Sequence, residues 1–320
     1  MNDNNSAQGP SFDAFDGPLL QDPYPFFAQW IDESPVFYAE EIGYWVITRY
    51  EDCRRALKDY PVFSASNTLD PLFPPCPAAG KALADGGFRS IPTMTNVDPP
   101  AHTRTRRIAH QAFTPRRVRA MEDVVRGIVR PFLGDRVAGT TSDFVADVAW
   151  ALPAHVIFSI LGLSPSEVAE VKAGSSTRLA FMFGQAEEDE QVETAKGMAE
   201  FWLYCEDLAN DRRSNPRDDF TTDLVTRPDA DGNPLTQQEV SAILFGLLLA
   251  GHETTTSLLT NGLRRLLENR ESWEAICADP SLIPNAVEEI LRFDSSVVHW
   301  RRKTTQPVAV CGVEIPADAN

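Results

Sequence analysis

The feature that most constrains the fold is a long apolar segment, residues 236–268. It opens with the sequence TQQE, the spacing of a capping box, in which threonine and glutamate side chains bond the free N–H groups at the start of a helix. At 1.5 Å per residue, such a helix spans roughly 50 Å, enough to cross the molecule. Residues 243–249 are apolar on nearly every side, which indicates burial. We therefore predict a fold built around one central helix.

Short β-type runs lie near the two ends of the chain. Residues 36–38 and 44–48 are rich in aromatic and branched side chains and are separated by Gly43. Residues 307–316 alternate in the manner of a hairpin. The predicted fold class is therefore mainly α with small β-sheets.

Helices are expected over residues 50–59 and from residue 102 almost to residue 300. Residues 70–98 are rich in proline and glycine, so we predict a long loop there. Breaks in the helical region are predicted at 114–115, 139–140, 164–165, 215–216 and 229–234, with a second capping box at 164–167. Residues 1–25 read as a flexible lead-in, and residues 26–320 as a single domain.

The net charge of −17 argues against a nucleic-acid binder and against adsorption to an anionic membrane, because both need a basic surface. The five scattered cysteines form no CxxC pair, which favours free thiols in a reducing compartment. Residues 1–18 lack an apolar signal region, and the longest apolar stretch, residues 242–251, is about half of a bilayer span. We expect a cytoplasmic protein with no membrane anchor.

The central helix carries an unusual polar segment, residues 250–255 (AGHETT). Gly251 weakens a helix by about 1 kcal/mol relative to alanine, and threonine side chains bond to preceding carbonyls and open the backbone ladder. We expect a groove beside Ala250 and Gly251 in which a small ligand approaches the backbone. Glu253 and Thr254 then supply an acid and a hydroxyl, the pair that relays protons through ordered water.

Two other interpretations of this segment compete. A threonine-rich patch also occurs in ordinary helix packing. His252-Glu253 could begin the HExxH motif of zinc proteases, but that motif needs a second histidine one turn later. Residue 256 is Thr256, which argues against zinc.

Two further pairs have the spacing of one helical turn. Glu289 and Arg292 lie three apart and share a helix face. His102 and Arg106 lie four apart and can point at the same anion. A surface ion pair and a solvated basic face are the ordinary explanations of such pairs.

These motifs, in this order, resemble those of the cytochromes P450. Residues 250–255 resemble the oxygen-binding helix, and the resemblance implies that Glu253 and Thr254 deliver protons to dioxygen. His102 and Arg106 resemble the HxxxR helix and would bind the haem propionates. The agreement continues through residues 112–118, and the resemblance covers the chain from Asp22 onward.

Glu289 and Arg292 resemble the family's ExxR pair, which is buried and structural. Further along, the resemblance implies a propionate contact from Arg302, with Arg301 as the alternative. Val297 and Val298 would lie over the haem and shape the substrate pocket.

The resemblance implies a P450 fold, haem b as cofactor, dioxygen as co-substrate and a small apolar organic substrate that is hydroxylated or dealkylated. Electrons would come from NAD(P)H through a ferredoxin or a reductase domain, with no nucleic-acid or membrane partner. Residues 35–50 and 276–285 resemble haem domains fused to an FMN/[2Fe-2S] reductase. Four arginines would form a basic patch for an acidic electron donor: Arg104, Arg107, Arg116 and Arg117.

A P450 needs a cysteine thiolate as the axial iron ligand, in a loop that contains phenylalanine and glycine. None of the five cysteines has that setting, so we expect the ligand to lie beyond Asn320. We accordingly expect the 320-residue chain alone to bind haem poorly and to be inactive. The second hypothesis is a haem-free, non-catalytic P450-like fragment that acts at most as a binding module.

Overall fold

The structure is a computed structural model that describes residues 10–13, 15, 17–134 and 141–320. The helices of the first half are α1 (Gly17–Gln21), α2 (Tyr24–Glu33), α3 (Tyr50–Lys58), α4 (Pro77–Asp85), α5 (Ala101–Ala112), α6 (Pro115–Ala120), α7 (Glu122–Leu133), a π-helical turn (Val145–Ala149) and α8 (Leu152–Leu161). Those of the second half are α9 (Val168–Phe183), α10 (Glu188–Ser214), α11 (Phe220–Thr226), α12 (Gln237–Ala250), α13 (Glu253–Glu268), α14 (Arg270–Ala278) and α15 (Ile283–Phe293), with a 3-10 turn at Pro280–Leu282.

Three two-stranded antiparallel sheets complete the described part of the chain. Their strands are β1 (Val36–Ala39) with β2 (Tyr44–Ile47), β3 (Phe63–Ser64) with β4 (Lys303–Thr304), and β5 (Val308–Val310) with β6 (Val313–Ile315). The β3–β4 pair joins the two ends of the chain. The fold class predicted from the sequence, mainly α with small sheets, is confirmed.

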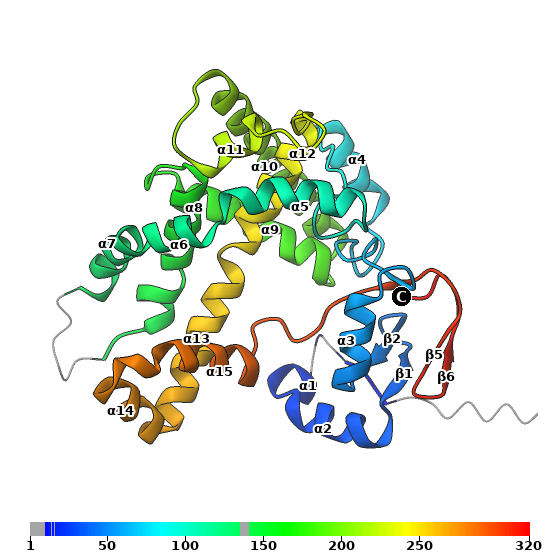
Figure 1. The fold of residues 1–320 in the computed structure, drawn as a ribbon. Coiled ribbons are helices and arrows are strands. Elements are labelled where there is room, and N and C mark those ends of the chain that lie inside the picture. The colour runs from blue at the N-terminus through cyan, green and yellow to red at the C-terminus, as the bar shows by residue number, and fades with distance from the viewer. Residues whose placement is uncertain (1–9, 14, 16, 135–140) are drawn as a thin grey trace, which may run out of the picture.

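Figure 1 shows α12 and α13 as one broken column that descends through the middle of the molecule. Helices α4, α5, α10 and α11 surround its upper end, and α14 and α15 lie beside its lower end. The β-strands and α1–α3 form a separate lobe, to which the C-terminal strands return.

The main core encloses α12. Its largest fully buried side chains are Phe158 of α8, Trp202 of α10, Phe220 of α11 and Phe245 of α12. Burying each large apolar side chain contributes roughly 1.5–3 kcal/mol. The central column is therefore held mainly by apolar packing. By length and composition, the stretch Gln237–Glu268 is long and apolar enough to cross a membrane. Its first half, α12, is buried among other helices, as is usual for a core helix.

Most predicted boundaries are confirmed. The hairpin β1–β2, helix α3, the β5–β6 pair and the breaks at 114–115, 164–165 and 215–216 lie where the sequence indicated. The break at 139–140 lies outside the described residues. The stretch 17–25, expected to belong to the lead-in, contains α1, and Leu19 of α1 is buried in a small core cluster with Trp30.

The prediction of a loop over residues 70–98 is wrong, because α4 lies inside it. Pro77 stands at the first turn, where its missing N–H costs nothing, and the Cys76 side chain accepts a hydrogen bond from Ala79 N. Ala79 is fully buried, and α4 packs against α10. The prolines mark the helix start here instead of excluding a helix.

The prediction of the central helix is confirmed at its start, but the helix is broken in its middle. The Thr236–Glu239 capping box makes both of its bonds. However, α12 ends at Ala250 and α13 begins at Glu253. At the break, His252 N reaches only Leu249 O, at 3.4 Å, a three-residue step. The helix predicted as continuous is therefore two helices joined by a tight turn.

Asp294, which follows α15, connects three elements. It accepts hydrogen bonds from Tyr24 Oη at 2.8 Å and from Arg265 Nε at 2.6 Å. Burial and the neighbouring Asp294 raise the pKa of Tyr24 to about 12, so this phenol remains a donor through the neutral pH range. The network ties α2 and α13 to the end of α15.

Gly251 permits the close approach of α8. A Cβ at this position would overlap the side chain of Ile157 and lie 2.8 Å from Leu247 O. Since overpacking costs typically about 1–3 kcal/mol, we expect Gly251→Ala to lower the free energy of unfolding by that amount in urea titrations. Gly127→Ala is the matched control, because a Cβ at this exposed position of α7 meets nothing within 4 Å and should stabilise by roughly 0.5–1 kcal/mol. Equal effects of the two changes would contradict this account.

Candidate functional site

One face of the central column is open. Gly246, Ala250 and Thr254 follow one another at steps of four residues, which places them near one face. A Cβ at Gly246 would meet nothing within 4 Å, and Ala250 and Thr254 are exposed. We call these three residues the open face. It offers a ligand direct access to the backbone of α12.

The groove expected beside Ala250 and Gly251 is only half correct. Ala250 is exposed, but the space beside Gly251 is filled by Ile157. Gly251 therefore serves helix packing, and Gly246, one turn earlier, makes the second small position of the groove. The sequence pattern missed Gly246 because it lies in an ordinary apolar run.

The threonines after the break bond to backbone carbonyls, as predicted. Thr254 Oγ1 donates to Ala250 O at 3.0 Å and Thr260 Oγ1 to Thr256 O at 3.0 Å. Thr256 is buried and donates to Ala149 O of the π-helical turn at 2.9 Å. Thr256 is thus a packing residue, whereas the Thr254 hydroxyl remains at the open face.

Glu253 points to the other side, toward a buried charged cluster. Its Oε1 lies 3.4 Å from Lys172 Nζ and 3.2 Å from His252 Nδ1, and Lys172 Nζ lies 3.1 Å from His252 Nδ1. An ammonium group only donates hydrogen bonds, so Lys172 donates both to the imidazole and to the carboxylate. We call Lys172, His252 and Glu253 the buried relay cluster.

Lys172 is 4% exposed and His252 is fully buried. The ammonium lies 4.1 Å from the centroid of the Trp150 ring, a cation–π contact. Burial lowers the pKa of Lys172, and the Glu253 carboxylate opposes that shift. The Glu253 carboxylate therefore stabilises the charged form of Lys172, which burial alone disfavours.

Two predicted anion-binding residues lie on α5. His102 is half-buried and Arg106 is exposed one turn later, so both side chains remain available to an anion. Arg104, expected to contribute to a basic patch, instead pairs with Asp229 at 2.7 Å and with Glu239. Arg107 is exposed, and the side chains of Arg116 and Arg117 lie outside the described part. The patch therefore lacks Arg104, because two carboxylates hold it.

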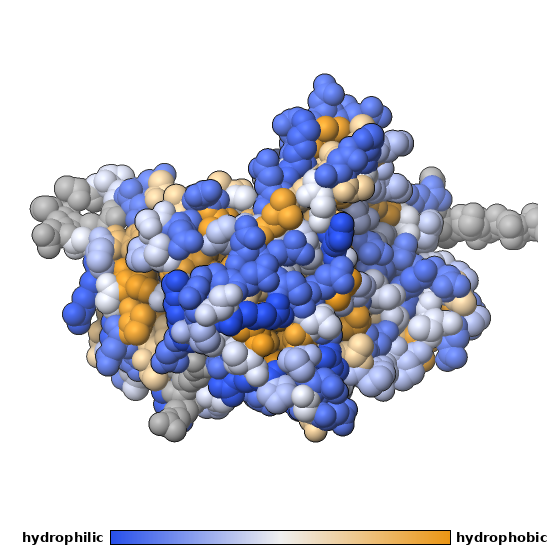
Figure 2. Space-filling view, turned by 90° about the horizontal axis from the view of Figure 1, so that it is seen from above, coloured by the Kyte–Doolittle hydropathy of each residue, from blue (hydrophilic) through white to orange (hydrophobic). Residues whose placement is uncertain are grey.

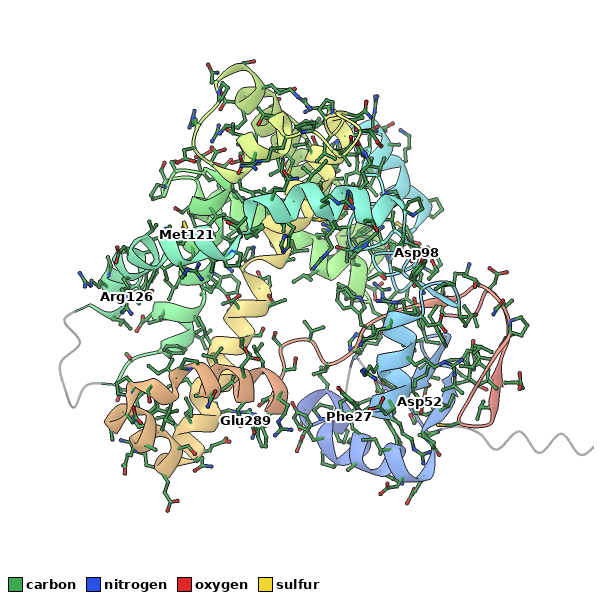
Figure 3. The ribbon with its side chains drawn as sticks, in the orientation of Figure 1. Phe27, Asp52, Asp98, Met121, Arg126 and Glu289 are labelled. Carbon is green, nitrogen blue, oxygen red and sulfur yellow. The ribbon has the colours of Figure 1, made fainter. Side chains whose placement is uncertain are left out.

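The structure separates the two arginine alternatives near the end of the chain. Arg301 donates to Asp70 O at 2.7 Å and to Thr68 O at 2.9 Å, so its guanidinium serves the loop. Arg302 is half-buried and uses Nη1 for Arg301 O. Burial lowers the pKa of Arg302, and Asp98, labelled in Figure 3, partly opposes this. Of the two, Arg302 is the group that an added anion would stabilise.

The Glu289–Arg292 pair forms two hydrogen bonds of 2.7 Å, as its spacing predicts. Its expected burial is wrong: the side chains are 59% and 68% exposed, and Figure 3 shows Glu289 on the outside of α15. Leu291 of α15 is exposed as well, as are Val297 and Val298. No element of the described chain covers this side of α15, which explains why the pair is solvated.

A pocket of about 860 Å³ opens between α7 and α8, lined by aliphatic side chains that include Val125, Val129 and Ile160. Met121 and Arg126 mark its wall in Figure 3. Figure 2 shows hydrophobic side chains exposed on the side of the molecule where α7 lies. None of the site residues predicted from the sequence lines this pocket, so it is distinct from the open face.

The distal half of a haem site fits these residues. A flat ring would have room on the open face, where no side chain fills the space at Gly246, and Arg302 would supply a guanidinium for its carboxylates. An axial cysteine does not fit. Cys205 is fully enclosed in α10, and the others lie in α3, at the start of α4, in α14 and at the β5–β6 turn. The described residues would thus provide one side of such a cofactor.

The fold is helical with one open face on its central column, and comparison with known proteins names its family. The family profile described as Cytochrome P450 matches residues 180–320. Vitamin D(3) 25-hydroxylase of Pseudonocardia autotrophica is 33% identical, over 95% of this chain and 73% of that protein.

Two solved structures are similarly close. The cytochrome P450 CREJ in complex with (4-ethylphenyl) dihydrogen phosphate is 37% identical with a TM-score of 0.88, over 93% of this chain and 74% of that one. An intact type IV self-sufficient cytochrome P450 monooxygenase is 34% identical with a TM-score of 0.90, over 98% of this chain and 41% of that one.

The chain belongs to the cytochrome P450 family. The resemblance and the P450 fold stated from the sequence are confirmed. Members of the family bind haem b, and the protein is a cytochrome P450 monooxygenase. Two cations of α9 that enter the core, Lys172 and Arg178, were not predicted from the sequence. The sequence signal that could have indicated these two residues is that charged side chains interrupt an otherwise apolar helix face.

The charge of Lys172 should make stability depend on pH. Because burial lowers its pKa below the usual 10.5, the unfolded chain binds more protons than the folded protein between the two values. The free energy of unfolding contributed by this group therefore rises with pH in that window. Tyr24 has a raised pKa, so its contribution to stability falls with pH above its usual pKa of 10. This contribution is the same in wild type and in a Lys172 variant, so it cancels in their comparison.

We expect urea titrations at pH values that approach the usual lysine pKa of 10.5 from below to show wild type gaining stability relative to Lys172→Met as pH rises. Lys196→Met, which removes an exposed lysine of α10, is the control and should run parallel to wild type. Parallel curves for Lys172→Met as well would show that burial does not shift this lysine.

Proposed function

We propose that the protein inserts one oxygen atom of dioxygen into an organic substrate bound at the open face. The observation that carries this proposal is the juxtaposition at the α12–α13 break: the Thr254 hydroxyl at the open face and the Glu253 carboxylate in the buried relay cluster. Haem supplies the oxygen-activating chemistry when bound. The remaining roles belong to side chains of this chain.

Thr254 holds a hydroxyl at the open face and passes a proton toward the oxygen that reacts there. Glu253 replaces that proton. Its Oε1 lies 3.4 Å from the Lys172 ammonium, and a proton taken up by the carboxylate reaches Thr254 once the side chain turns or a water connects the two groups. His252 is fixed beside both groups by Phe158, whose ring meets the imidazole edge-on at 5.6 Å. Proton transfer by positioned groups of this kind contributes roughly 10²–10⁴-fold to a rate.

His102, Arg106 and Arg302 would hold the two haem propionates, since each presents a donor that no carboxylate of the described chain engages. Val297 and Val298 are apolar and exposed before β4, and they would shape the substrate pocket together with Ala250. Gly251 lets α8 press against the column, and Glu289–Arg292 stiffens α15. Residues 26–320 would act as one haem domain.

The relatives support a substrate that is largely apolar. One acts on vitamin D(3) according to its name, and another binds an ethylphenyl phosphate. Electrons would come from a reductase or ferredoxin. Similarity to a self-sufficient monooxygenase over 98% of this chain supports a reductase of the fused kind, and the acidic charge of −17 suits a cytoplasmic protein.

The test of the class is spectroscopic. The complete native protein, loaded with haem, reduced and exposed to carbon monoxide, should give the red-shifted band of a thiolate-bound haem. A band at the position typical of histidine-bound haem, or no haem binding at all, would sink the proposal and favour a non-catalytic binding module.

The relay makes a separate prediction. Thr254→Ala removes the hydroxyl at the open face, so product per electron consumed should fall by about tenfold or more while peroxide release rises. Ser257→Ala removes an exposed hydroxyl from the same helix and should leave coupling unchanged. Product and peroxide are measured against NAD(P)H consumed. Unchanged coupling in Thr254→Ala would remove Thr254 from the relay.

A further inference from the structure

A second cation of α9 lies deeper than Lys172. Arg178 is 8% exposed and stacks over the ring of Phe245, 4.4 Å from its centroid. Its Nη1 donates to Phe245 O at 3.2 Å and its Nε points at Met182 Sδ at 3.1 Å. Nη2 has no hydrogen bond to the described residues, and it is not one of the fully enclosed, unpaired side-chain atoms. One edge of the guanidinium therefore borders accessible space.

The charge of Arg178 has no carboxylate partner in the described part of the chain. Other buried arginines are compensated: Arg212 donates to Asp219 at 2.5 Å, and Arg301 gives two hydrogen bonds to backbone carbonyls. Burial lowers the pKa of Arg178 to about 10. The neighbouring Cys205 cannot supply a negative charge, because burial raises the pKa of its thiol. An uncompensated buried cation is costly, so an anion at Nη2 would stabilise it.

Arg178 lies close to the open face along the column. The carbonyl that it contacts belongs to the peptide that joins Phe245 to Gly246, and the space beside Gly246 is empty. From Phe245 to Thr254 the column advances on the order of 13 Å at 1.5 Å per residue. The Thr254 hydroxyl thus lies at one end of the open face, and the Arg178 guanidinium bonds the carbonyl that adjoins Gly246 at the other end.

A second hydrogen-bond donor in this region is also unpaired. Trp202 is fully buried, its Nε1 has no partner, and its ring lies 5.9 Å from that of Phe245. Buried donors are normally satisfied in folded proteins. Trp202 Nε1 is enclosed, so of the two donors beside the Phe245 ring only the Arg178 edge borders accessible space.

We propose that Arg178 binds an anionic group of the substrate, a phosphate monoester or a carboxylate, while the apolar body of the substrate lies along the open face toward Thr254. The inference rests on the proposed function for the reaction at Thr254. It adds the substrate class: an amphiphile with one anionic end and an oxidisable carbon about one substituted aromatic ring away. The planar guanidinium suits both anions because it can donate two parallel hydrogen bonds.

The test is a binding measurement that needs no turnover. Three ligands with the same apolar body, 4-propylphenyl phosphate, 4-propylbenzoate and 4-propylphenol, are titrated into the haem-loaded native protein by calorimetry. We expect at least one anion to bind about tenfold or more tightly than the neutral phenol, as charged hydrogen bonds imply. The tighter of the two anions identifies the group. Equal binding of all three would overturn the proposal without any variant.

Variants then assign the site to Arg178. Arg178→Gln should weaken the preferred anion about tenfold or more and leave the phenol within about twofold. Arg178→Lys keeps the charge but loses the two parallel N–H donors, so its affinity for the anion should lie between those of wild type and Arg178→Gln. Arg213→Gln, which removes an exposed charge from α10, is the matched control and should bind all three like wild type.

Loss of all three ligands in Arg178→Gln, with a lowered unfolding temperature, would show that Arg178 only supports the fold and would overturn the proposal. The result is independent of the oxygenase assignment. A missing carbon monoxide band leaves the anion preference measurable, and a missing anion preference leaves that band unaffected.

Discussion

The structure depends on the burial of α12 between α8 and α10. Phe245 packs against Phe201 and Trp202 on one side, and at the helix end Gly251 allows Ile157 to touch the backbone. Apolar burial of this kind is the main favourable term in folding. The column breaks beside the contact of α8 with residue 251, and on the far side of the break Glu253 faces inward while Thr254 stays at the open face.

Around this column, buried cations are compensated in different ways. Arg212 has Asp219, Arg301 has backbone carbonyls, and Lys172 has Glu253 beside a histidine and a tryptophan ring. Arg178 has an aromatic ring, a thioether and one carbonyl. Buried charge is kept in proteins only where something offsets it, so these differences separate structural cations from functional ones. Among these four cations, Arg178 is the one that has neither a carboxylate nor two carbonyl acceptors in the described part of the chain.

Several site residues could be predicted from the sequence because their meaning is local. The capping box at Thr236, the i, i+3 pair of Glu289 with Arg292 and the carbonyl-bonding threonines need only helix geometry, and each forms as expected. The helix α4 was missed because its stability comes from Ala79 packing on α10, which no local pattern reveals. The assignment of Arg104 to a basic patch failed for the same reason, since Asp229 and Glu239 are distant in sequence.

The sequence by itself determined the family and the helical class, and it indicated Glu253 and Thr254 as the candidate acid and alcohol, because these depend on residue order and on spacings of three and four along a helix. Only the tertiary structure decided that Gly251 serves packing, that the space beside Gly246 is empty, that Arg301 bonds two loop carbonyls, and that Arg178 has no carboxylate partner in the described part of the chain. Those facts concern which surfaces meet and which charges remain uncompensated. They follow from contacts between helices far apart in the chain, where periodicity carries no information.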